Sequence, residues 1–387
     1  MPRPLTIAFL ACNKNPDRFR EDASWLYRCD NLAAALGQAG HSVHQGHWRR
    51  FGGAAVRQLV EGAVERAVER DDRRQRTAPD IVVLHRPQLS LGLRARLWWW
   101  RRQGTLVLAD VDDLVFLPEL APQSPGVLNG WVGLPETKRR FAAHAAALAL
   151  VDGVTVSTTA LASEVAARWP GKPVLVLHNA VHHSWRTEAS TLQPPDTDAT
   201  YPGPVIRYLP GTRSHERDFA AVAPVLASLL QQHPEVQLDI IGPLTLPEQF
   251  PTAQVRQRSK LPFDQYKTAV CGATVNLAPL ELTRFNASKS GLKVVEAAWW
   301  GVPTLCSPNA DTQRLAQAGA GAVEAASLDA WRIELERLLF EPGHRAALAG
   351  GLRERVLAVA DIHANARTWL DWVQGVARQG LQTKGPT

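Results

Sequence analysis

A short segment with the sequence SKSGLKVVEAAW contains the residue types best suited to bind a phosphate group. Ser288 and Ser290 come just before an apolar run with helical spacing, so we expect either serine to cap a helix. Gly291 has no side chain that would keep a ligand away from the backbone. Because the N–H groups and the dipole at the start of a helix attract anions, the segment predicts an anion site there.

Two lysines and a glutamate follow one another through the same segment. Lys289, Lys293 and Glu296 are spaced four and three residues apart, which places them on one face of a helix. Ammonium groups followed by a carboxylate one turn further suit a nucleotide, with the lysines on the diphosphate and Glu296 on the ribose hydroxyls. An ordinary capped helix with solvated lysines is the alternative interpretation.

A second polar loop, GTRSHERDF, follows the strand-like run PVIRYLP. It brings together Gly211, Thr212, Arg213 and His215. In an open parallel sheet, ligands bind beyond the carboxyl ends of the strands, where this loop is expected to lie. Arg213 can hold two phosphate oxygens at once, so the loop is predicted to complete the anion site. A capped turn with an exposed arginine is the alternative.

Three aspartates, Asp110, Asp112 and Asp113, end a strand-like run in the first half of the chain, LVLADVDDLVF. Asp112 or Asp113 is expected to act as general base on an acceptor hydroxyl, because the pKa of a carboxylate in a cleft can be tuned. A helix or loop cap is the alternative. The run also resembles the nucleophile strand of haloacid-dehalogenase-like phosphatases, which would use Asp110 and Asp112, but the later strands supply no acidic pair.

Two further strand ends in the first half carry polar residues. His85 and Arg86 end the run DIVVLHRP, and Arg86 is expected to meet an anionic acceptor, whereas His85 is either catalytic or a structural histidine. His178 and Asn179 end the run VLVLHNA and are expected at the floor of a cleft. Turn chemistry explains Asn179 equally well.

Apolar runs alternate with helix-period stretches through most of the chain, which is typical of βαβ units with parallel sheets. The length of 387 residues exceeds the range in which a single core keeps growing. We predict an α/β protein with one domain at 1–184, a linker rich in Pro, Thr and Asp at 185–204 and a second domain at 205–362. A helix and tail at 363–387 are expected to cross back onto the first domain.

Composition excludes several classes of protein. With 45% hydrophobic and 21% charged residues, the chain is an ordinary globular protein. No apolar run reaches the length of a membrane span, and MPRPLTIAFLACNKN is expected to form a strand rather than a signal peptide. The four cysteines have no metal-ligand spacing, so we expect reduced thiols in the cytoplasm. The net charge of +6 suits anionic ligands, but no nucleic-acid-binding module is recognised.

Three consecutive tryptophans, Trp98 to Trp100, stand between pairs of arginines in LRARLWWWRR. Aromatic rings beside arginines suit the boundary between water and lipid, so contact with an anionic inner leaflet is one hypothesis. A helix that faces the core and keeps its charged flanks in water is the alternative.

The order of these motifs resembles the donor domain of group 1 glycosyltransferases with the GT-B architecture. The matching segments are PGTRSHERDF, HPEVQLDIIGPL, LPFDQYKTAV, NLAPLE and SKSGLKVVEAAWWGVPTLCS, with VTVSTTALASEVA and VLVLHNAVHHSW similar to the end of the family's first domain. The resemblance covers most of the chain and is sharpest from Val205 to Pro308. It implies two Rossmann-like domains that face a cleft, the first for the acceptor and the second for the nucleotide sugar.

The resemblance also implies roles for individual residues. In that family a pair of glutamates separated by seven residues marks the site; Glu296 matches the second member, and Ser288 stands at the first. Gly291 and Leu292 match the backbone amides that meet the diphosphate, and Arg213 matches a basic residue that neutralises it. The resemblance implies no cofactor and no metal ion.

The function expected from this resemblance is transfer of a hexose-type sugar from a nucleoside diphosphate to a hydroxyl acceptor, in the synthesis of a surface polysaccharide or glycoconjugate. The partners would be a nucleotide sugar and a glycan or lipid-linked acceptor. Because Ser288 replaces a glutamate, a non-catalytic nucleotide-sugar-binding scaffold remains an alternative. The expected donor site consists of Arg213 and Lys289 as catalytic cations together with Gly211, Thr212, His215, Ser288, Ser290, Gly291, Leu292, Lys293 and Glu296.

Overall fold

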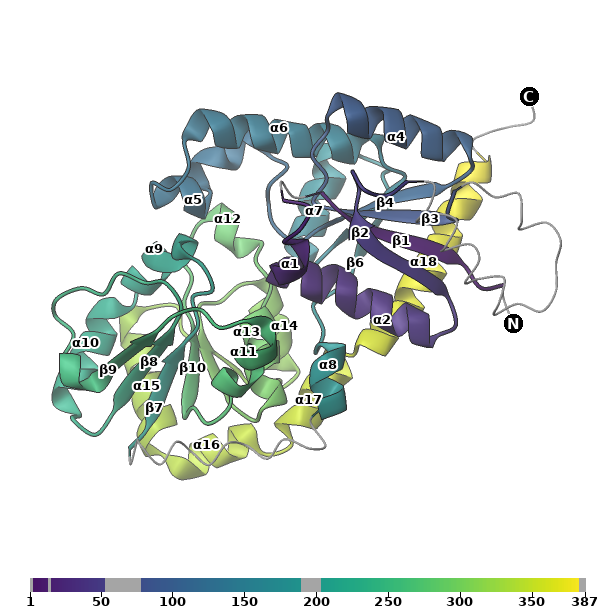
Figure 1. Ribbon diagram of the computed structural model, residues 1–387. Helices are drawn as coiled ribbons and strands as arrows, with labels where there is room; N and C mark the ends of the chain where they lie inside the picture. The colour runs from purple at the N-terminus through teal and green to yellow at the C-terminus, as the bar shows by residue number, and fades with distance from the viewer. Residues whose placement is uncertain (1–2, 13–14, 53–77, 189–202, 383–387) are drawn as a thin grey trace. The chain divides into compact units, whose positions relative to one another are not determined.

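The structure is a computed structural model that describes residues 3–12, 15–52, 78–188 and 203–382 (Figure 1). The chain divides into two compact units. The first unit contains residues 1–121, 135–178 and 362–387, and the second contains residues 122–134 and 179–361.

A parallel six-stranded sheet with the order β2-β1-β3-β4-β5-β6 forms the centre of the first unit. Its strands are β1 (Thr6–Ala11), β2 (Ser42–His47), β3 (Ile81–His85), β4 (Leu106–Val111), β5 (Gly153–Val156) and β6 (Val174–Val176). The inner strands are almost wholly buried, as expected for apolar runs covered on both faces. His85 at the end of β3 pairs in register with Asp110 on β4, so the predicted polar strand ends lie side by side.

The helices of the first unit begin at short polar caps. They are α1 (Ala23–Trp25) with the π-turn Leu26–Asp30, α2 (Asn31–Gln38), α4 (Leu91–Arg102), α6 (Leu134–Leu150), α7 (Thr159–Arg168) and α18 (Ile362–Gln382). Ser90 caps α4 by accepting a hydrogen bond from the Leu93 amide, and Thr158 caps α7 in the same way. The last helix, α18, packs against α2 and buries Trp369 near Phe9, so the end of the chain returns to the first unit.

The second unit has a parallel six-stranded sheet with the order β12-β11-β10-β7-β8-β9. Its strands are β7 (Val205–Tyr208), β8 (Gln237–Ile241), β9 (Val255–Arg258), β10 (Val275–Ala278), β11 (Thr304–Cys306) and β12 (Ala322–Glu324). The chain builds outward in one direction through β8 and β9 and in the other through β10, β11 and β12. The strand order therefore reverses between β7 and β10, which is where open parallel sheets bind ligands.

Helices cover both faces of this second sheet. They are α8 (His183–Glu188), the 3-10 turn η5 (Arg213–His215), α9 (Glu216–Ala220), α10 (Ala223–Gln232), α11 (Phe263–Val270), α12 (Arg284–Ala287), α13 (Leu292–Trp299), α14 (Ala310–Gln317), α15 (Leu328–Phe340), α16 (Pro342–Ala349) and α17 (Leu352–Val359). Leu305 packs with the cluster around α10 and α15, whereas its neighbour Cys306 packs with the cluster around α13 and α17. Adjacent strand residues point to opposite faces, so the two clusters lie on opposite sides of the sheet.

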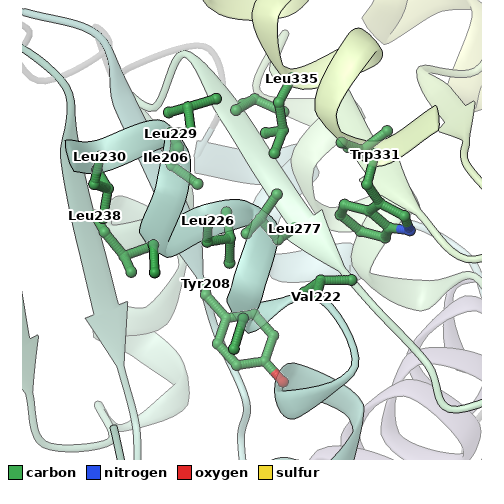
Figure 2. Close-up of a cluster of buried hydrophobic side chains, with 14 of the residues drawn as sticks. Ile206, Tyr208, Val222, Leu226, Leu229, Leu230, Leu238, Leu277, Trp331 and Leu335 are labelled. Atoms are coloured by element: carbon green, nitrogen blue, oxygen red, sulfur yellow. The ribbon is translucent and has the colours of Figure 1, made fainter. Parts of the chain in front are cut away.

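Figure 2 shows part of the first of these clusters. Leu226 of α10 and Leu335 of α15 are fully buried together with Ile206 and Leu277 from the sheet, and Trp331 closes the cluster at one side. Full burial of a side chain of this size contributes about 1.5–3 kcal/mol. The cluster holds β7 and β10 side by side and so fixes the two strand ends that carry the predicted donor residues.

The predicted α/β architecture with two domains is confirmed, and so is the return of the last helix to the first unit. The start of the predicted linker is wrong, because Trp185–Glu188 belong to α8 and the indole of Trp185 is buried against Phe263 and Trp300. The rest of that linker up to residue 202 lies outside the described residues. All four cysteines lie within the described residues, are buried and form no disulfide bond.

Residues 122–134 group with the second unit although they precede the predicted boundary at residue 184. The periodicity of the sequence does not predict that this segment groups with the second unit. In the part of the chain that the structure describes, no helix has both the length and the apolar character needed to cross a bilayer.

Candidate functional site

The loops that follow β7 and β10 carry most of the predicted donor residues. Tyr208 near the end of β7 pairs in register with Leu277 on β10, so both loops leave the sheet at the same edge. The reversal of strand order lies between these strands. The fold therefore brings the GTRSHERDF and SKSGLKVVE segments together at the expected ligand edge of the second unit.

The loop after β7 makes a tight turn. Gly211 has a φ of +75°, which favours glycine, and the Thr212 amide donates to the Pro210 carbonyl over 2.8 Å. Gly242 lies against this turn, where a Cβ would come within 3.0 Å of the Pro210 ring. The Thr212 and Ser214 hydroxyl oxygens are 2.6 Å apart. The turn is thus fixed before the chain reaches Arg213.

The Arg213 side chain is exposed and keeps its charge uncompensated. Its guanidinium carbon lies 4.9 Å from the ring centroid of Trp131. Among the described residues no carboxylate pairs with it, whereas Arg217 one turn later forms an ion pair with Glu281. Arg213 is therefore available to an anionic ligand.

His215 and Asp218 form a hydrogen-bonded pair at the start of α9. The Nδ1 atom of His215 lies 2.8 Å from an Asp218 carboxylate oxygen. The other oxygen of Asp218 accepts hydrogen bonds from the Glu281 amide at 2.8 Å and from the Asn286 side chain at 2.9 Å. Asp218 thus links the loop after β7 to the loop after β10.

Burial, hydrogen bonding and nearby charges shift the pKa values of His215 and Asp218. Burial lowers the pKa of His215 and the nearby Lys289 lowers it further, while Asp218 opposes both. Burial raises the pKa of Asp218, but hydrogen bonding and charge from His215, with the charge of Lys289, bring it below its ordinary value. An ionised Asp218 can only accept, so the neutral imidazole carries its proton on Nδ1 and leaves Nε2 as an acceptor.

The helix after β10 begins later than the sequence predicts. Ser288 follows the last residue of α12 as its C-cap, and α13 starts at Leu292 with Gly291 in the N-cap position and no side-chain cap. The prediction that Ser288 or Ser290 caps this helix is wrong. Instead the Ser290 hydroxyl accepts a hydrogen bond from the side-chain amide of Asn179 at 2.8 Å. Ser288 ends the short helix α12, and the residues from Ser288 to Gly291 connect it to α13.

Gly291, just before α13, lets the chain pack closely against α14. A Cβ on Gly291 would lie 2.5 Å from the Leu315 side chain of α14. The Gly291 amide donates to an Asp311 oxygen over 2.7 Å, so it is already engaged, in contrast to the expectation that it meets a ligand. Among the described residues, the amides of Leu292 and Lys293 donate to no protein group. These two amides are the donors that α13 offers to an anion.

The two lysines lie in different surroundings. The ammonium group of Lys293 donates to the Leu209 carbonyl in the loop after β7. Burial lowers the pKa of Lys293, with Glu296 opposing this effect and Lys289 adding to it. Lys289 lies before α13 and is half-buried, and its charge acts on both His215 and Asp218. The structure therefore brings Lys289, Lys293 and His215 together at one edge.

Glu296 lies one turn further along α13 and is buried, with 5% of its surface exposed. Its carboxylate accepts a hydrogen bond from the Tyr266 hydroxyl of α11 at 2.9 Å. Burial raises the pKa of Tyr266, and the charge of Glu296 raises it further. The Tyr266 phenol thus fixes the position of the Glu296 carboxylate on α13.

The predicted acceptor residues of the first unit are engaged with one another. Arg86 donates to Asp112 at 2.6 Å and to Asp113 at 3.2 Å, and Ser24 donates to Asp112 at 2.5 Å. Burial raises the pKa of Asp112, but the charges of Arg86 and His85 more than offset this and lower it. An ion-paired carboxylate of low pKa is a poor proton acceptor, so the geometry argues against Asp112 as general base.

His85 and Arg86 are placed by the end of β3. The Nε2 atom of His85 lies 3.0 Å from the Ser24 hydroxyl, and its Nδ1 atom lies 3.4 Å from Asp110. Arg86 has a φ of +48°, which costs energy for a residue with a side chain. The Arg86 amide donates to the Asp110 carbonyl over 2.9 Å, and the two aspartates after β4 bind its guanidinium.

Both carboxylate oxygens of Asp110 are engaged within the protein. It is buried, and its oxygens accept from Arg28 at 3.1 and 2.7 Å and from Thr155 at 2.7 Å. Burial raises the pKa of Asp110, but the charge of Arg28 lowers it below its ordinary value. Because both oxygens are occupied by a guanidinium, Asp110 cannot serve as the nucleophile that the phosphatase alternative requires.

Several residues around the predicted donor site were not themselves predicted. They are Trp131, Asp218, Tyr266, Asn286 and Asp311. Asp218 lies three residues after His215, and this helical spacing was a usable signal. Asn286 stands two residues before Ser288, whereas Trp131, Tyr266 and Asp311 come from more distant parts of the sequence, so no local pattern marks these three.

One family model matches part of the chain in sequence. Residues 217–371 match the model of the family described as "Glycosyl transferase-like". No curated protein matches the chain in sequence.

Solved structures resemble the chain over its length in fold. Anabaena HepE in complex with UDP and glucose is 12% identical, with 96% of this chain and 100% of HepE covered and a TM-score of 0.60. WaaG, a glycosyltransferase involved in lipopolysaccharide biosynthesis, is 14% identical, with 94% and 98% covered and a TM-score of 0.58. The chain spans 54% of TarM, at 10% identity and a TM-score of 0.52, with 76% of this chain covered.

These likenesses agree with the fold of two parallel six-stranded sheets. Residues 217–371 thus match a glycosyl transferase-like family model, and the chain as a whole has the two-domain GT-B fold.

Proposed function

We propose that the protein transfers a sugar from a nucleoside-diphosphate sugar to a hydroxyl acceptor. The observation that carries this proposal is the gathering of Lys289, Lys293 and the open amides of α13 at the point where the strand order of the second sheet reverses. Arg213, which pairs with no carboxylate among the described residues, adds a cation on the neighbouring loop. An edge with these groups suits a diphosphate.

Catalysis in this proposal depends on the leaving group. Negative charge develops on the diphosphate as the glycosidic bond breaks, and Arg213, Lys289 and Lys293 stabilise it together with the helix amides. Removal of one such donor costs about 3 kcal/mol of transition-state stabilisation. These cations replace a metal ion, so we expect turnover to be the same with and without a chelator.

The donor nucleotide is held further along α13. Glu296 accepts hydrogen bonds from the ribose hydroxyls, and Tyr266 keeps its carboxylate in place. Support for a nucleotide sugar comes from HepE, whose structures contain UDP with glucose and UDP-glucose. We therefore propose a hexose as the transferred sugar.

A role in surface polysaccharide or glycoconjugate synthesis, with a glycan or lipid-linked acceptor, is part of the proposal. Its support is the likeness in fold to WaaG, which is involved in lipopolysaccharide biosynthesis. The place of the reaction would be the cytoplasm at the inner face of the plasma membrane. Trp98 on α4 is 59% exposed beside Arg102, which suits contact with anionic lipid.

The experiment that tests the proposal follows nucleoside diphosphate release from a panel of nucleotide sugars in the presence of acceptor extracts. Release that depends on both donor and acceptor is expected, with Arg213→Ala as the inactive control. Saturable binding of a nucleotide sugar without release would instead identify a scaffold, the alternative raised by Ser288 at the position of the family's first glutamate. Absence of both binding and release would refute the proposed site.

A further inference from the structure

The segment from residue 122 to residue 134 comes from the first half of the sequence but packs within the second unit. It contains the short helix α5 (Pro125–Leu128), which lies against η5, the turn that carries Arg213. The segment therefore contacts the loop after β7.

Asn129 joins the segment to that loop. Its side-chain amide donates to the Pro125 carbonyl over 2.8 Å and to the Ser214 carbonyl over 3.0 Å. The first bond closes the turn around α5, and the second attaches it to η5. The Trp131 amide donates to the Gly126 carbonyl over 2.9 Å, so the backbone on either side of the indole is fixed.

Trp131 presents its ring to Arg213. The guanidinium carbon lies 4.9 Å from the ring centroid, and the tryptophan is 48% exposed. A guanidinium above an indole is attracted by the ring electrons without losing its positive charge. Arg217, by contrast, is neutralised by Glu281. An indole thus orders the Arg213 side chain and leaves the whole charge for an anion.

We propose that Trp131 is a positioning residue for the donor diphosphate, acting by holding the Arg213 guanidinium ready to bind it. This inference rests on the proposed function and adds to it a group from the first half of the chain. An arginine that is ordered before the ligand arrives loses less side-chain freedom on binding, and this raises affinity.

The test measures binding of UDP, GDP, ADP and dTDP by calorimetry to the full-length protein and to variants. Trp131→Ala should weaken the best-bound nucleotide about two- to fivefold, the value of an exposed cation–π contact. Trp131→Phe keeps an aromatic ring and should retain most of the affinity. Trp98→Ala removes a similarly exposed tryptophan, 4.6 Å below Arg102, and should leave affinity unchanged.

A double-variant comparison separates positioning from a general structural effect. In an Arg213→Ala background, Trp131→Ala should cause no further loss, because the indole acts only through the guanidinium. An equal loss in both backgrounds overturns the inference, and so does an unchanged affinity in Trp131→Ala alone.

The outcomes distinguish the inference from the proposed function. If the wild type binds a nucleoside diphosphate and Trp131→Ala binds it equally well, only the role of Trp131 is overturned. If the wild type binds none of the four nucleotides, the proposed donor site is overturned and the role of Trp131 with it. Unchanged melting of Trp131→Phe shows that the fold tolerates substitution at this position.

Discussion

The Asp311 carboxylate accepts a hydrogen bond from the Gly291 amide over 2.7 Å, at the mouth of α13. A second oxygen of the same carboxylate accepts from Arg314 at 2.9 Å. The protein thus places its own anion on one of the amides that the family resemblance assigns to the diphosphate. The amides of Leu292 and Lys293, next along the helix, are left as the donors for a ligand.

Gly291→Ala should destabilise the protein. The new Cβ would lie 2.5 Å from the end of the fully buried Leu315 side chain, so this side chain or its surroundings must shift, at a cost of about 1–3 kcal/mol. The measurement is the free energy of unfolding in urea. Gly375→Ala in α18 is the matched control, since nothing lies within 4 Å of a Cβ there, and it should stabilise by about 0.4–1 kcal/mol. Equal stability of the two variants would contradict the packing role of Gly291.

Arg213→Ala and Lys289→Ala should each lower turnover about 100-fold, because each removes a charge that stabilises the leaving diphosphate, a loss of about 3 kcal/mol. Their melting temperatures should stay near that of the wild type, since Arg213 is exposed and Lys289 is half-buried. Steady-state sugar transfer and thermal melting are measured together. Arg332→Ala removes an exposed arginine of α15 and serves as the control. A normally folded Lys289→Ala with wild-type turnover would remove that lysine from the mechanism.

Stability should fall as the solution is acidified below about pH 6.5, in part because of His144. Burial lowers the pKa of His144 to about 3, and the charges of Arg86, Arg140 and His85 add to this against a hydrogen bond to Pro87. Between about pH 6.5 and pH 3, His144 therefore binds a proton in the unfolded chain, where its pKa is about 6.5, but not in the folded protein. The stability that the neutral ring contributes is complete above about pH 6.5 and is lost as the pH falls toward 3.

The measurement for His144 is urea unfolding between pH 7 and pH 5. A lowered pKa of this size contributes a slope of about 1.4 kcal/mol per pH unit once the unfolded histidine is protonated. His144→Asn has no proton to gain, so it should show a shallower loss over this range. Parallel curves for the wild type and the variant would show that His144 does not titrate on unfolding.

Trp98→Ala should weaken binding to vesicles that contain anionic lipid. The Trp98 ring is 59% exposed and lies 4.6 Å from Arg102, whereas Trp100 is fully buried. Substitution of Trp100 by alanine should instead destabilise the fold by about 3–5 kcal/mol. Vesicle flotation compares Trp98→Ala with Trp131→Ala, which removes an exposed tryptophan from the second unit. Equal flotation of Trp98→Ala and the wild type would exclude α4 as the lipid contact.

Local sequence patterns predicted the fold well because each strand of a parallel sheet is buried on both faces and must be a continuous apolar run. The runs that became β7 and β10 were recognised in this way, and the loops after them were expected at one sheet edge. The same periodicity misplaced the start of α13. It could not separate the short turn of α12 from the helix that follows, because both have helical spacing.

The sequence by itself determined which residue types stand at the ends of the strands, and so fixed the candidate cations Arg213, Lys289 and Lys293. Tertiary structure decided which of their neighbours are already engaged. Asp311 accepts a hydrogen bond from the Gly291 amide, and Asp112 forms an ion pair with Arg86. The ring of Trp131 lies against the Arg213 guanidinium. These partners are distant in the chain and meet only when packing brings their elements together, and no spacing rule within one helix or strand encodes such a meeting.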